Sequence, residues 1–368
     1  MAMKKRVLIF LGLACLILST VPAINLVSGN VIHHDKKHWW LRSVLYNVDF
    51  FLVHSNRLLY AAGISPVPHQ VVIGKDGWLY IGDGYGDAIS VARRGATPAD
   101  IAASEEVGAA VRAWEEWFAR KQVSLYKLIL FPNKETIYPE FLPDWVQPAS
   151  ASAADTLLAH LPRGSYVDTR PALRSARSVF SEPLYYRTDT HWNKLGAWLA
   201  FAAFSRELAR SEPGLRLLSD RDIRVLSVAE RAGGDLANLL RIRKILRDSE
   251  VGIEITGEKQ VEIEQYSFAT GQRVAYDSNP QNRAQKTPLL LKTKNALNQK
   301  RVLWLHDSFG VAMAPFMAAT FSDILWLHYD DASPAQLAQL VETYAPEYVF
   351  ISVVERRALD KWFRKGPP

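Results

Sequence analysis

Two short polar stretches, far apart in the sequence, carry the residue types of a nucleophilic relay. Ser308 follows an apolar run at residues 302–305 and precedes a helical pattern, so we expect it at a strand-to-helix turn on a sheet edge. Asp189 and His191 are two residues apart, and in an extended segment their side chains point the same way. The carboxylate can then fix one tautomer of the imidazole while the other ring nitrogen faces a serine hydroxyl. We therefore predict that Ser308, His191 and Asp189 form a Ser-His-Asp relay.

Each stretch also has a simpler explanation. Ser308 could do no more than cap the helix that follows it. His191, which precedes Trp192, could be a half-buried packing histidine. A nucleophile, a base and an orienting carboxylate at the ends of predicted core elements together favour the catalytic interpretation.

A third polar cluster, Pro132-Asn133-Lys134-Glu135, directly follows an apolar run at residues 125–131. Open α/β sheets bind their ligands at the carboxyl ends of their strands, so we expect the cluster close to Ser308. The Asn133 amide can donate to a tetrahedral oxyanion, as can backbone N–H groups of the turn that contains Phe309. Asn133 and Phe309 are therefore the candidates for oxyanion and substrate binding, and a plain polar loop is the alternative.

The elements that position these residues alternate between strands and helices. A turn at Asp76-Gly77 between two apolar runs predicts a β-hairpin over residues 71–81. Four residues precede helical patterns and are expected to cap them: Thr97, Ser152, Asn193 and Ser333. Further strands are predicted at residues 125–131, 166–168, 301–305, 324–327 and 348–351. This alternation predicts an α/β fold with a parallel sheet flanked by helices on both faces.

Residues 212–299 differ in character from the rest. Val251, Ile253 and Ile255 alternate with polar residues, which predicts strands, so we expect a β-rich insertion that could cover the site. Several basic residues before these strands are expected on one short helical stretch: Arg241, Arg243, Lys244 and Arg247. They could contact an anionic polymer, although a solvated face is the simpler interpretation.

Composition limits the classes of protein to consider. Of 368 residues, 48% are hydrophobic and 22% are charged, which is typical of a globular protein. The net charge of +6 favours anionic partners, but the basic residues are scattered and no nucleic-acid-binding motif accompanies them. The only cysteine, Cys15, lies in an N-terminal apolar run, so disulfides and thiolate metal sites are excluded elsewhere.

The N-terminus predicts export. Lys4, Lys5 and Arg6 precede an almost uninterrupted apolar run at residues 7–27, about the length that spans a bilayer as a helix. These charges keep the N-terminus in the cytoplasm, so we expect the remaining chain in the periplasm, anchored to the inner membrane. A cleaved signal peptide is the alternative, because Val21-Pro22-Ala23 resembles a cleavage site.

Four stretches together resemble the exported alginate O-acetyltransferase family of the AlgJ and AlgX type, whose domain is similar to SGNH hydrolases. They are Gly74-Lys75-Asp76-Gly77-Trp78-Leu79, Pro132-Asn133-Lys134-Glu135, Asp189-Thr190-His191-Trp192 and Asp307-Ser308-Phe309. The family carries its catalytic Asp and His in the third stretch and its Ser in the fourth, which correspond to Asp189, His191 and Ser308. One departure is His306, which stands in place of a glycine two residues before Ser308.

The resemblance implies a polysaccharide O-acetyltransferase with an SGNH hydrolase-like domain over residues 71–368. Residues 31–70 would form a membrane-proximal segment, and residues 1–30 the anchor or signal sequence. Acetyl would pass through an acyl-enzyme on Ser308 to hydroxyls of an exported polysaccharide such as alginate, with no metal or cofactor. A membrane-bound O-acyltransferase partner would deliver the acetyl group. Two other functions stay open: a carbohydrate acetylesterase with the same triad, and a non-catalytic scaffold of a polysaccharide-secretion complex.

Overall fold

The computed structural model describes residues 2–27, 40–256, 261–276 and 287–368 of the chain. The chain divides into two compact units. The smaller unit comprises Met1–Pro66 and Leu240–Ile242, and the larger comprises Val67–Leu239 and Arg243–Pro368. All of the candidate catalytic residues belong to the larger unit.

The smaller unit begins with a long apolar helix, α1 (Ala2–Val27), followed by α3 (Arg42–Leu45) and α4 (Asp49–Ala61). Within α1, the segment Lys4–Val27 is 24 residues long and apolar enough to cross a membrane. It is the single such helix in the part of the chain that the structure describes. An N-terminal helix of membrane-spanning length is therefore present, as predicted.

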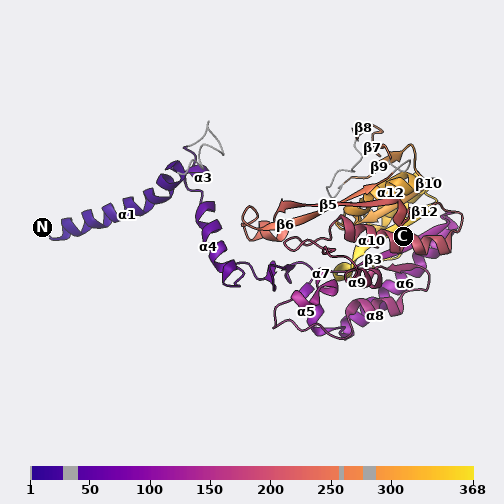
Figure 1. The fold of residues 1–368 in the computed structure, drawn as a ribbon, viewed down its shortest axis with the longest axis horizontal. Helices are drawn as coiled ribbons and strands as arrows, with labels where there is room; N and C mark the ends of the chain where they lie inside the picture. The colour runs from indigo at the N-terminus through magenta and orange to yellow at the C-terminus, as the bar shows by residue number, and fades with distance from the viewer. Residues whose placement is uncertain (1, 28–39, 257–260, 277–286) are drawn as a thin grey trace. The chain divides into compact units, whose positions relative to one another are not determined.

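A mixed sheet of eight strands forms the centre of the larger unit (Figure 1). Its strands are β3 (Leu125–Phe131), β4 (Tyr166–Asp168), β7 (Ile263–Ser267), β8 (Arg273–Tyr276), β9 (Leu289–Thr293), β10 (Asn298–His306), β11 (Phe321–His328) and β12 (Tyr348–Val354). Five strands are parallel, in the order β4-β3-β12-β10-β11, and β9, β7 and β8 continue the sheet antiparallel beyond β11. The predicted parallel sheet is thus confirmed for five strands, and the insertion extends it.

Helices cover both faces of the sheet, which confirms the predicted fold class. One face packs against α9 (Arg170–Ala176), α10 (Lys194–Ser211) and α12 (Ala314–Thr320). The other packs against α6 (Pro98–Arg120), α8 (Ala153–His160) and α13 (Pro334–Tyr344). The strands are buried on both sides because successive side chains alternate between the layers: Trp304 faces the first, and Leu303 and Leu305 face the second.

Four of these helices begin at the residues predicted to cap them. The side chains of these residues each accept a hydrogen bond from the backbone N–H three positions later: Thr97, Ser152, Asn193 and Ser333. The cap at Asn193 bears on the site, because α10 starts directly after the His191-Trp192 pair. The buried face of α10, which includes Phe201 and Phe204, anchors that segment in the core.

The predicted hairpin is formed by β1 (Val71–Ile73) and β2 (Leu79–Ile81). Asp76 and Gly77 both have positive φ, 51° and 79°, and Trp78 N–H donates to Lys75 O at 2.9 Å. Positive φ at both central residues is typical of a type I′ turn, whose twist matches that of the flanking strands. The D-G pair therefore folds as the sequence predicts.

The insertion has three parts. Its strands β5 (Ile223–Ala232) and β6 (Arg247–Ile255) form a separate antiparallel ribbon, while β7, β8 and β9 join the main sheet. Between β5 and β6 lies α11 (Asp235–Leu239). The prediction of a helical stretch bearing Arg241 to Arg247 is wrong: Arg241 has φ 58°, a left-handed conformation that ends the helix, and Arg247 begins β6.

The C-terminal ends of the parallel strands meet at one edge of the sheet, and the polar candidates collect there. Asn133 follows β3, Ser308 follows β10 and Arg356 follows β12. Open α/β sheets bind their ligands at this edge. The remaining short helices of the unit are α5 (Ala88–Arg94), α7 (Lys134–Ile137), η1 (Pro139–Phe141), η2 (Asp220–Asp222), η4 (Gly310–Met313), η5 (Tyr329–Asp331) and η6 (Glu355–Arg357).

Candidate active site

Ser308 lies on a tight turn between β10 and the 3-10 helix η4. It is exposed, whereas Asp307 and Phe309 on either side of it are buried. The Asp307 carboxylate accepts hydrogen bonds from the N–H of Phe309 at 2.9 Å and of Val354 at 2.7 Å. These bonds fix the turn to the end of β12, so the Ser308 hydroxyl faces solvent from a rigid support.

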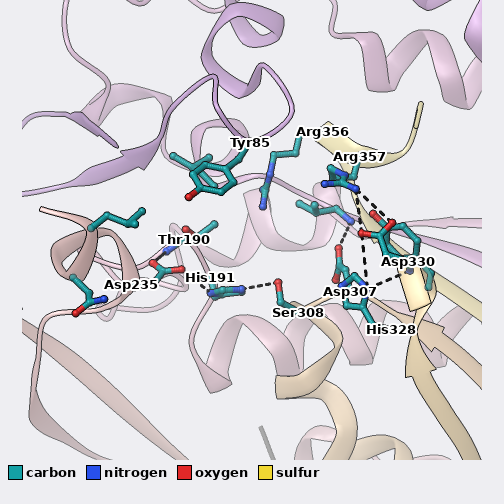
Figure 2. Close-up of a pocket in the computed structure, with 15 residues that line it drawn as sticks. Tyr85, Thr190, His191, Asp235, Asp307, Ser308, His328, Asp330, Arg356 and Arg357 are labelled. Carbon is teal, nitrogen blue, oxygen red and sulfur yellow. Dashed lines mark hydrogen bonds and ion pairs between the residues drawn. The ribbon is translucent and has the colours of Figure 1, made fainter. Parts of the chain in front are cut away.

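A continuous hydrogen-bond chain joins Ser308, His191 and Asp189. The distance between His191 Nε2 and Ser308 Oγ is 2.8 Å (Figure 2). The distance between His191 Nδ1 and Asp189 Oδ1 is also 2.8 Å. The carboxylate accepts from Nδ1–H, so Nε2 is left to accept from the Ser308 hydroxyl. A serine hydroxyl, an imidazole and a carboxylate in this order can generate an alkoxide-like nucleophile.

The segment that carries Asp189 and His191 is bent, so the expectation of an extended segment is wrong. Tyr185 and Trp192 pair as an isolated antiparallel bridge, and the chain turns between them. Within the turn, the N–H of His191 donates to Asp189 Oδ1 at 3.1 Å. An Asp side chain that accepts from the backbone two residues on is a common way to close such a turn. The two side chains meet through this turn and not through strand alternation.

The charges around His191 raise its pKa. Burial alone lowers it, but the hydrogen bond and the charge of Asp189 outweigh burial; Asp235 adds to them and Arg356 opposes them. For Asp189, burial acts to raise the pKa, yet the contacts with His191 and the backbone N–H of Asp235 hold it well below its usual range. Asp189 is therefore ionised and can stabilise the imidazolium that forms when His191 accepts a proton.

A buried lysine binds the carbonyl groups of residues 186–191, which we call the relay loop. Lys134 is 3% exposed. Its Nζ donates to the backbone oxygens of Tyr186 at 3.0 Å, Arg187 at 3.2 Å and Asp189 at 2.6 Å. Three carbonyl dipoles thus converge on one ammonium group, and the backbone of the catalytic aspartate candidate is held directly.

The β1–β2 hairpin completes the environment of Lys134. Its ammonium lies 5.6 Å from the centre of the Trp78 ring and 5.4 Å from that of the Tyr80 ring. Burial lowers the pKa of Lys134 to about 8, although the charge of Asp189 acts in the opposite direction. The hairpin also bonds the relay loop itself, because Leu79 N–H donates to the Arg187 carbonyl at 2.8 Å.

Two carboxylates from the insertion bind the opposite, donor side of the relay loop. Asp248 of β6 accepts from the N–H of Thr188 at 2.8 Å and from its hydroxyl at 2.6 Å. Asp235 accepts from the N–H of Thr190 at 2.7 Å, and its own N–H donates to Asp189 Oδ2 at 3.1 Å. The insertion therefore helps to build the site as well as to border it.

The relay loop and the Ser308 turn are braced against each other. Trp192 Nε1 donates to the Phe309 carbonyl at 3.1 Å, and the two rings pack edge-on at 5.2 Å. The Phe309 ring also lies 4.9 Å from the ring of His191. These contacts explain why a tryptophan follows the histidine: it fixes the distance between His191 and Ser308.

Ser308 and His191 open into a pocket of about 390 Å³. Asp235 lines it beside His191, and Figure 2 shows Tyr85 and Arg356 reaching into it towards Ser308 and His191. Its size suits a small acyl group together with part of a sugar. Several carboxylates and two guanidinium groups in the wall make it polar.

The other predicted site residues lie behind the wall of this pocket. Asn133 is buried and is not among the lining residues; its Oδ1 accepts from Arg356 Nη1 at 2.8 Å. The N–H of Phe309 is used by Asp307, whereas the N–H of Ser308 has no partner among the described residues. His306 points into the core, where its ring stacks on Trp326 at 4.8 Å, so it does not enter the site.

Two pocket residues were missed by the sequence analysis. Asp235 starts α11 after Gly233-Gly234, and a Cβ on Gly234 would lie 2.3 Å from that of Asp189. A glycine pair before an acidic helix start was the signal for this close approach. Arg356 follows the apolar strand β12, which is the same strand-then-polar pattern that identified Asn133.

Asp189, His191 and Asp235 offer ligand atoms within 4.8 Å of one another, which also suits a metal ion. Their hydrogen bonds favour the relay instead. Both ring nitrogens of His191 are engaged, by Asp189 and by Ser308. Both oxygens of Asp189 accept as well, from His191 and from the N–H of Asp235.

Solved structures with the same fold include PatB1 from Bacillus cereus, with a TM-score of 0.60 and 16% identity over 79% of this chain and 97% of that one. A DHHW family protein from Eubacterium siraeum has a TM-score of 0.54 and 16% identity over 71% of this chain and 89% of that one. At these identities the likeness concerns the fold alone.

In sequence, the chain is 30% identical over 202 residues to a protein of Pseudomonas aeruginosa named "Probable alginate O-acetylase AlgJ". The match covers 51% of this chain and 46% of that protein, so the chain spans about half the length of this curated relative. Residues 71–296 match a family profile, and this stretch contains Asp189 and His191 but ends before Ser308. The chain therefore belongs to the family described as "SGNH hydrolase-like domain, acetyltransferase AlgX", which confirms the resemblance seen in its motifs.

Proposed function

We propose that this protein is an O-acetyltransferase that moves an acetyl group, through an acyl-enzyme on Ser308, to hydroxyls of an exported polysaccharide. The observation that carries the proposal is the hydrogen-bond chain from Ser308 through His191 to Asp189 at an open pocket. Membership of an acetyltransferase family supports the reaction class. The name of the AlgJ relative supports a polysaccharide acceptor such as alginate.

In the first half-reaction, Ser308 Oγ attacks the carbonyl carbon of the acetyl donor while its proton passes to His191 Nε2. The tetrahedral intermediate collapses, the bond to the donor oxygen breaks, and His191 returns the proton to the departing alcohol. Asp189 stabilises the imidazolium in between. The products are acetyl-Ser308 and the deacetylated donor.

In the second half-reaction, a sugar hydroxyl takes the place of that alcohol. His191 accepts the hydroxyl proton, the sugar oxygen attacks acetyl-Ser308, and the proton then returns to Ser308 Oγ as the acetylated sugar leaves. The N–H of Ser308, for which the described residues offer no partner, is the proposed backbone donor to the oxyanion. The amide nitrogen of Asn133, whose oxygen is held by Arg356, is proposed as a second donor, and the buried Phe309 ring is proposed to support the substrate wall from behind.

We further propose that the catalytic domain, residues 71–368, works in the periplasm. Residues 1–30 then form the inner-membrane anchor or signal sequence, and residues 31–70 a membrane-proximal segment. The apolar helix Lys4–Val27 with its basic N-terminal flank supports this topology. Since acetyl-CoA is cytoplasmic, the donor is proposed to come through a membrane-bound O-acyltransferase.

The test is acetyl transfer by the full chain in detergent, with nitrophenyl acetate as donor and alginate oligosaccharides as acceptor. Wild-type protein should yield acetylated oligosaccharide, measured by mass spectrometry. Ser308→Ala and His191→Ala should each abolish transfer while melting normally, and the double variant should be no worse, because the two residues act as a unit. Wild-type activity in Ser308→Ala would reject the nucleophile assignment.

The same assay separates a transferase from an acetylesterase, which has the same triad and uses water as the acceptor. Ser308 is exposed, so water can reach the acyl-enzyme, and this observation favours the esterase as the second candidate function. Release of acetate alone, with no labelled oligosaccharide at saturating acceptor, would identify an esterase.

Asn133→Ala should lower hydrolysis of nitrophenyl acetate about 100- to 1000-fold if its amide donates to the oxyanion.

A further inference from the structure

We propose that His306 is a positioning residue that aims the backbone N–H of Ser308 at the oxyanion. The inference rests on the proposed acyl-enzyme on Ser308, and it holds whether a sugar or water is the acceptor. It comes from a hydrogen bond between the His306 ring and the peptide group that joins Asp307 to Ser308. A glycine, which His306 replaces in the motif, has no side chain to make this bond.

The His306 ring and the N–H of Ser308 lie on opposite sides of one peptide group. His306 Nδ1 lies 2.7 Å from the carbonyl oxygen of Asp307, which also accepts from the N–H of Gly310 at 3.1 Å. In a trans peptide group the C=O and N–H bonds point in opposite directions, so a carbonyl held towards His306 turns the N–H away from it. His306 is buried in the core, whereas Ser308 is exposed and lines the pocket. The bond therefore keeps the N–H on the pocket side.

The surroundings of the His306 ring fix which nitrogen carries the proton. A carbonyl oxygen can only accept, so the proton of the neutral ring must be on Nδ1. Nε2 is buried and has no hydrogen-bond partner among the described residues. Burial lowers the pKa of His306 to about 4, so the ring is neutral at neutral pH. His306 therefore fixes the peptide group without adding a charge to the site.

Packing holds the ring in the orientation that this bond needs. The ring stacks on that of Trp326, with the ring centres 4.8 Å apart, and lies 5.0 Å from the ring of Trp304. The His306 side chain also packs directly on Gly310, because a Cβ built on that glycine would lie 2.7 Å from His306 Cβ. The glycine thus leaves room for the histidine, and the two tryptophans limit the rotation of its ring.

The bond has two consequences for the reaction. A fixed peptide group presents its N–H to the oxyanion without having to reorganise during the reaction. A hydrogen bond to the carbonyl also polarises the peptide group, which makes its N–H a stronger donor. Both effects act on the negative charge of the tetrahedral intermediates, which form in both half-reactions, and not on the bound ester. Loss of the bond should therefore lower kcat more than it changes KM.

Two substitutions separate this role from packing. His306→Phe keeps an aromatic ring against the two tryptophans and removes the donor. His306→Asn places an amide N–H near the position of Nδ1 and removes much of the ring. His160→Phe is the matched control, because His160 Nδ1 also lies 2.8 Å from a backbone carbonyl, that of Thr156, in a helix outside the pocket lining.

Hydrolysis of nitrophenyl acetate is measured with the full chain in detergent, as is inhibition by methylboronic acid, whose tetrahedral adduct with a serine mimics the intermediate. His306→Phe should melt like the wild type, but its kcat should fall about 10- to 100-fold at similar KM, because the N–H remains and is less well aimed. The boronate should bind this variant more weakly by a similar factor. His306→Asn should melt at a lower temperature yet keep most of the wild-type kcat per folded molecule. His160→Phe should keep the wild-type kcat.

Unchanged kcat and unchanged boronate binding in His306→Phe would overturn the inference while leaving the acyl-enzyme mechanism standing. A kcat per folded molecule in His306→Asn as low as that of His306→Phe would also overturn it and assign His306 to packing alone. If the hydrolysis seen in the wild type survives in Ser308→Ala, the proposed function itself fails, and the inference fails with it.

Discussion

The pKa of His191 decides at which pH the proposed base can work. His191 must be neutral to accept the proton of Ser308, and its pKa is raised by the contacts with Asp189 and Asp235 that outweigh burial. Below this pKa the imidazole is protonated and kcat/KM falls as pH falls; above it the rate reaches a plateau. The acid limb should therefore lie above the ordinary histidine value.

Asp235→Asn should move that limb. Asp235 Oδ2 lies 3.6 Å from His191 Nδ1, so its charge favours the protonated imidazole. Removing the charge should therefore lower the apparent pKa of His191 and move the acid limb to lower pH. The measurement is kcat/KM for nitrophenyl acetate against pH. Asp144→Asn, on an exposed carboxylate, is the control; an unmoved limb in Asp235→Asn would mean that His191 does not feel Asp235.

For single residues, type and spacing were enough to choose Ser308, His191 and Asp189 as candidates. A carboxylate and an imidazole two residues apart are an unusual pair in a sequence that also has a serine at the end of a predicted strand. Arg356 and Asp235 could not be chosen in the same way. Arginine and aspartate are common surface residues, and only the structure reveals that Arg356 binds the Asn133 amide and that Asp235 faces the imidazole.

Three elements far apart in sequence converge on the relay loop. The hairpin supplies the aromatic rings, the turn after β3 supplies Lys134, and the insertion supplies Asp248 and Asp235. Lys134 binds carbonyl groups and the two aspartates bind N–H groups, so the loop is held from both polar sides. A loop that positions a base within hydrogen-bond distance of its nucleophile needs such support.

Lys134→Met should cost both stability and turnover. It removes one donor from each of three carbonyl groups, of which only that of Arg187 keeps a second donor, the N–H of Leu79, and it frees the backbone of Asp189. We therefore expect a loss of about 2 to 4 kcal/mol in unfolding free energy. Turnover per folded molecule should fall about 10- to 100-fold, because the relay loop moves relative to Ser308. Chemical denaturation and active-site-normalised kcat measure the two effects separately.

The matched control is Lys127→Met. Lys127 lies on β3 and, like Lys134, has a largely buried ammonium group. Lys127 donates to the carbonyl of Gly164, away from the relay loop. It should destabilise the protein while leaving turnover per folded molecule unchanged. If Lys134→Met behaves in the same way, Lys134 serves stability alone.

The elements themselves were largely predictable, and the failures have local causes. Capping residues and apolar periodicity identify the helices, and the D-G turn identifies the hairpin, since these are short-range signals. The bend at residues 186–191 was missed because, besides the local bond from His191 to Asp189, it is held by Lys134, Asp235 and Asp248, which are distant in sequence. The helical stretch expected around Arg241 ends early because that residue adopts a left-handed conformation. Strand patterning in the insertion was correct, but pattern alone does not say which sheet a strand joins.

For the whole molecule, we predict the membrane topology from the N-terminal helix. A reporter that is active only in the periplasm, fused after Pro368, should be active and should remain with the membrane fraction. The basic flank at Lys4 to Arg6 retains the N-terminus in the cytoplasm, so replacing these residues by Glu should reduce export. Recovery of a soluble mature form that begins near Ile24 would replace the anchor with a cleaved signal peptide.

The most direct test of the central claim is to trap the acyl-enzyme. Wild-type protein and His191→Ala are mixed with nitrophenyl acetate, quenched in acid within the first turnover and digested. The masses of the peptides are then measured by mass spectrometry. The relay predicts one added acetyl group on the peptide that contains Ser308 in the wild type, little in His191→Ala, and its disappearance when acceptor oligosaccharide is added before the quench. An acetyl group on another residue, or full transfer by the wild type with Ser308 never acetylated, would contradict the account.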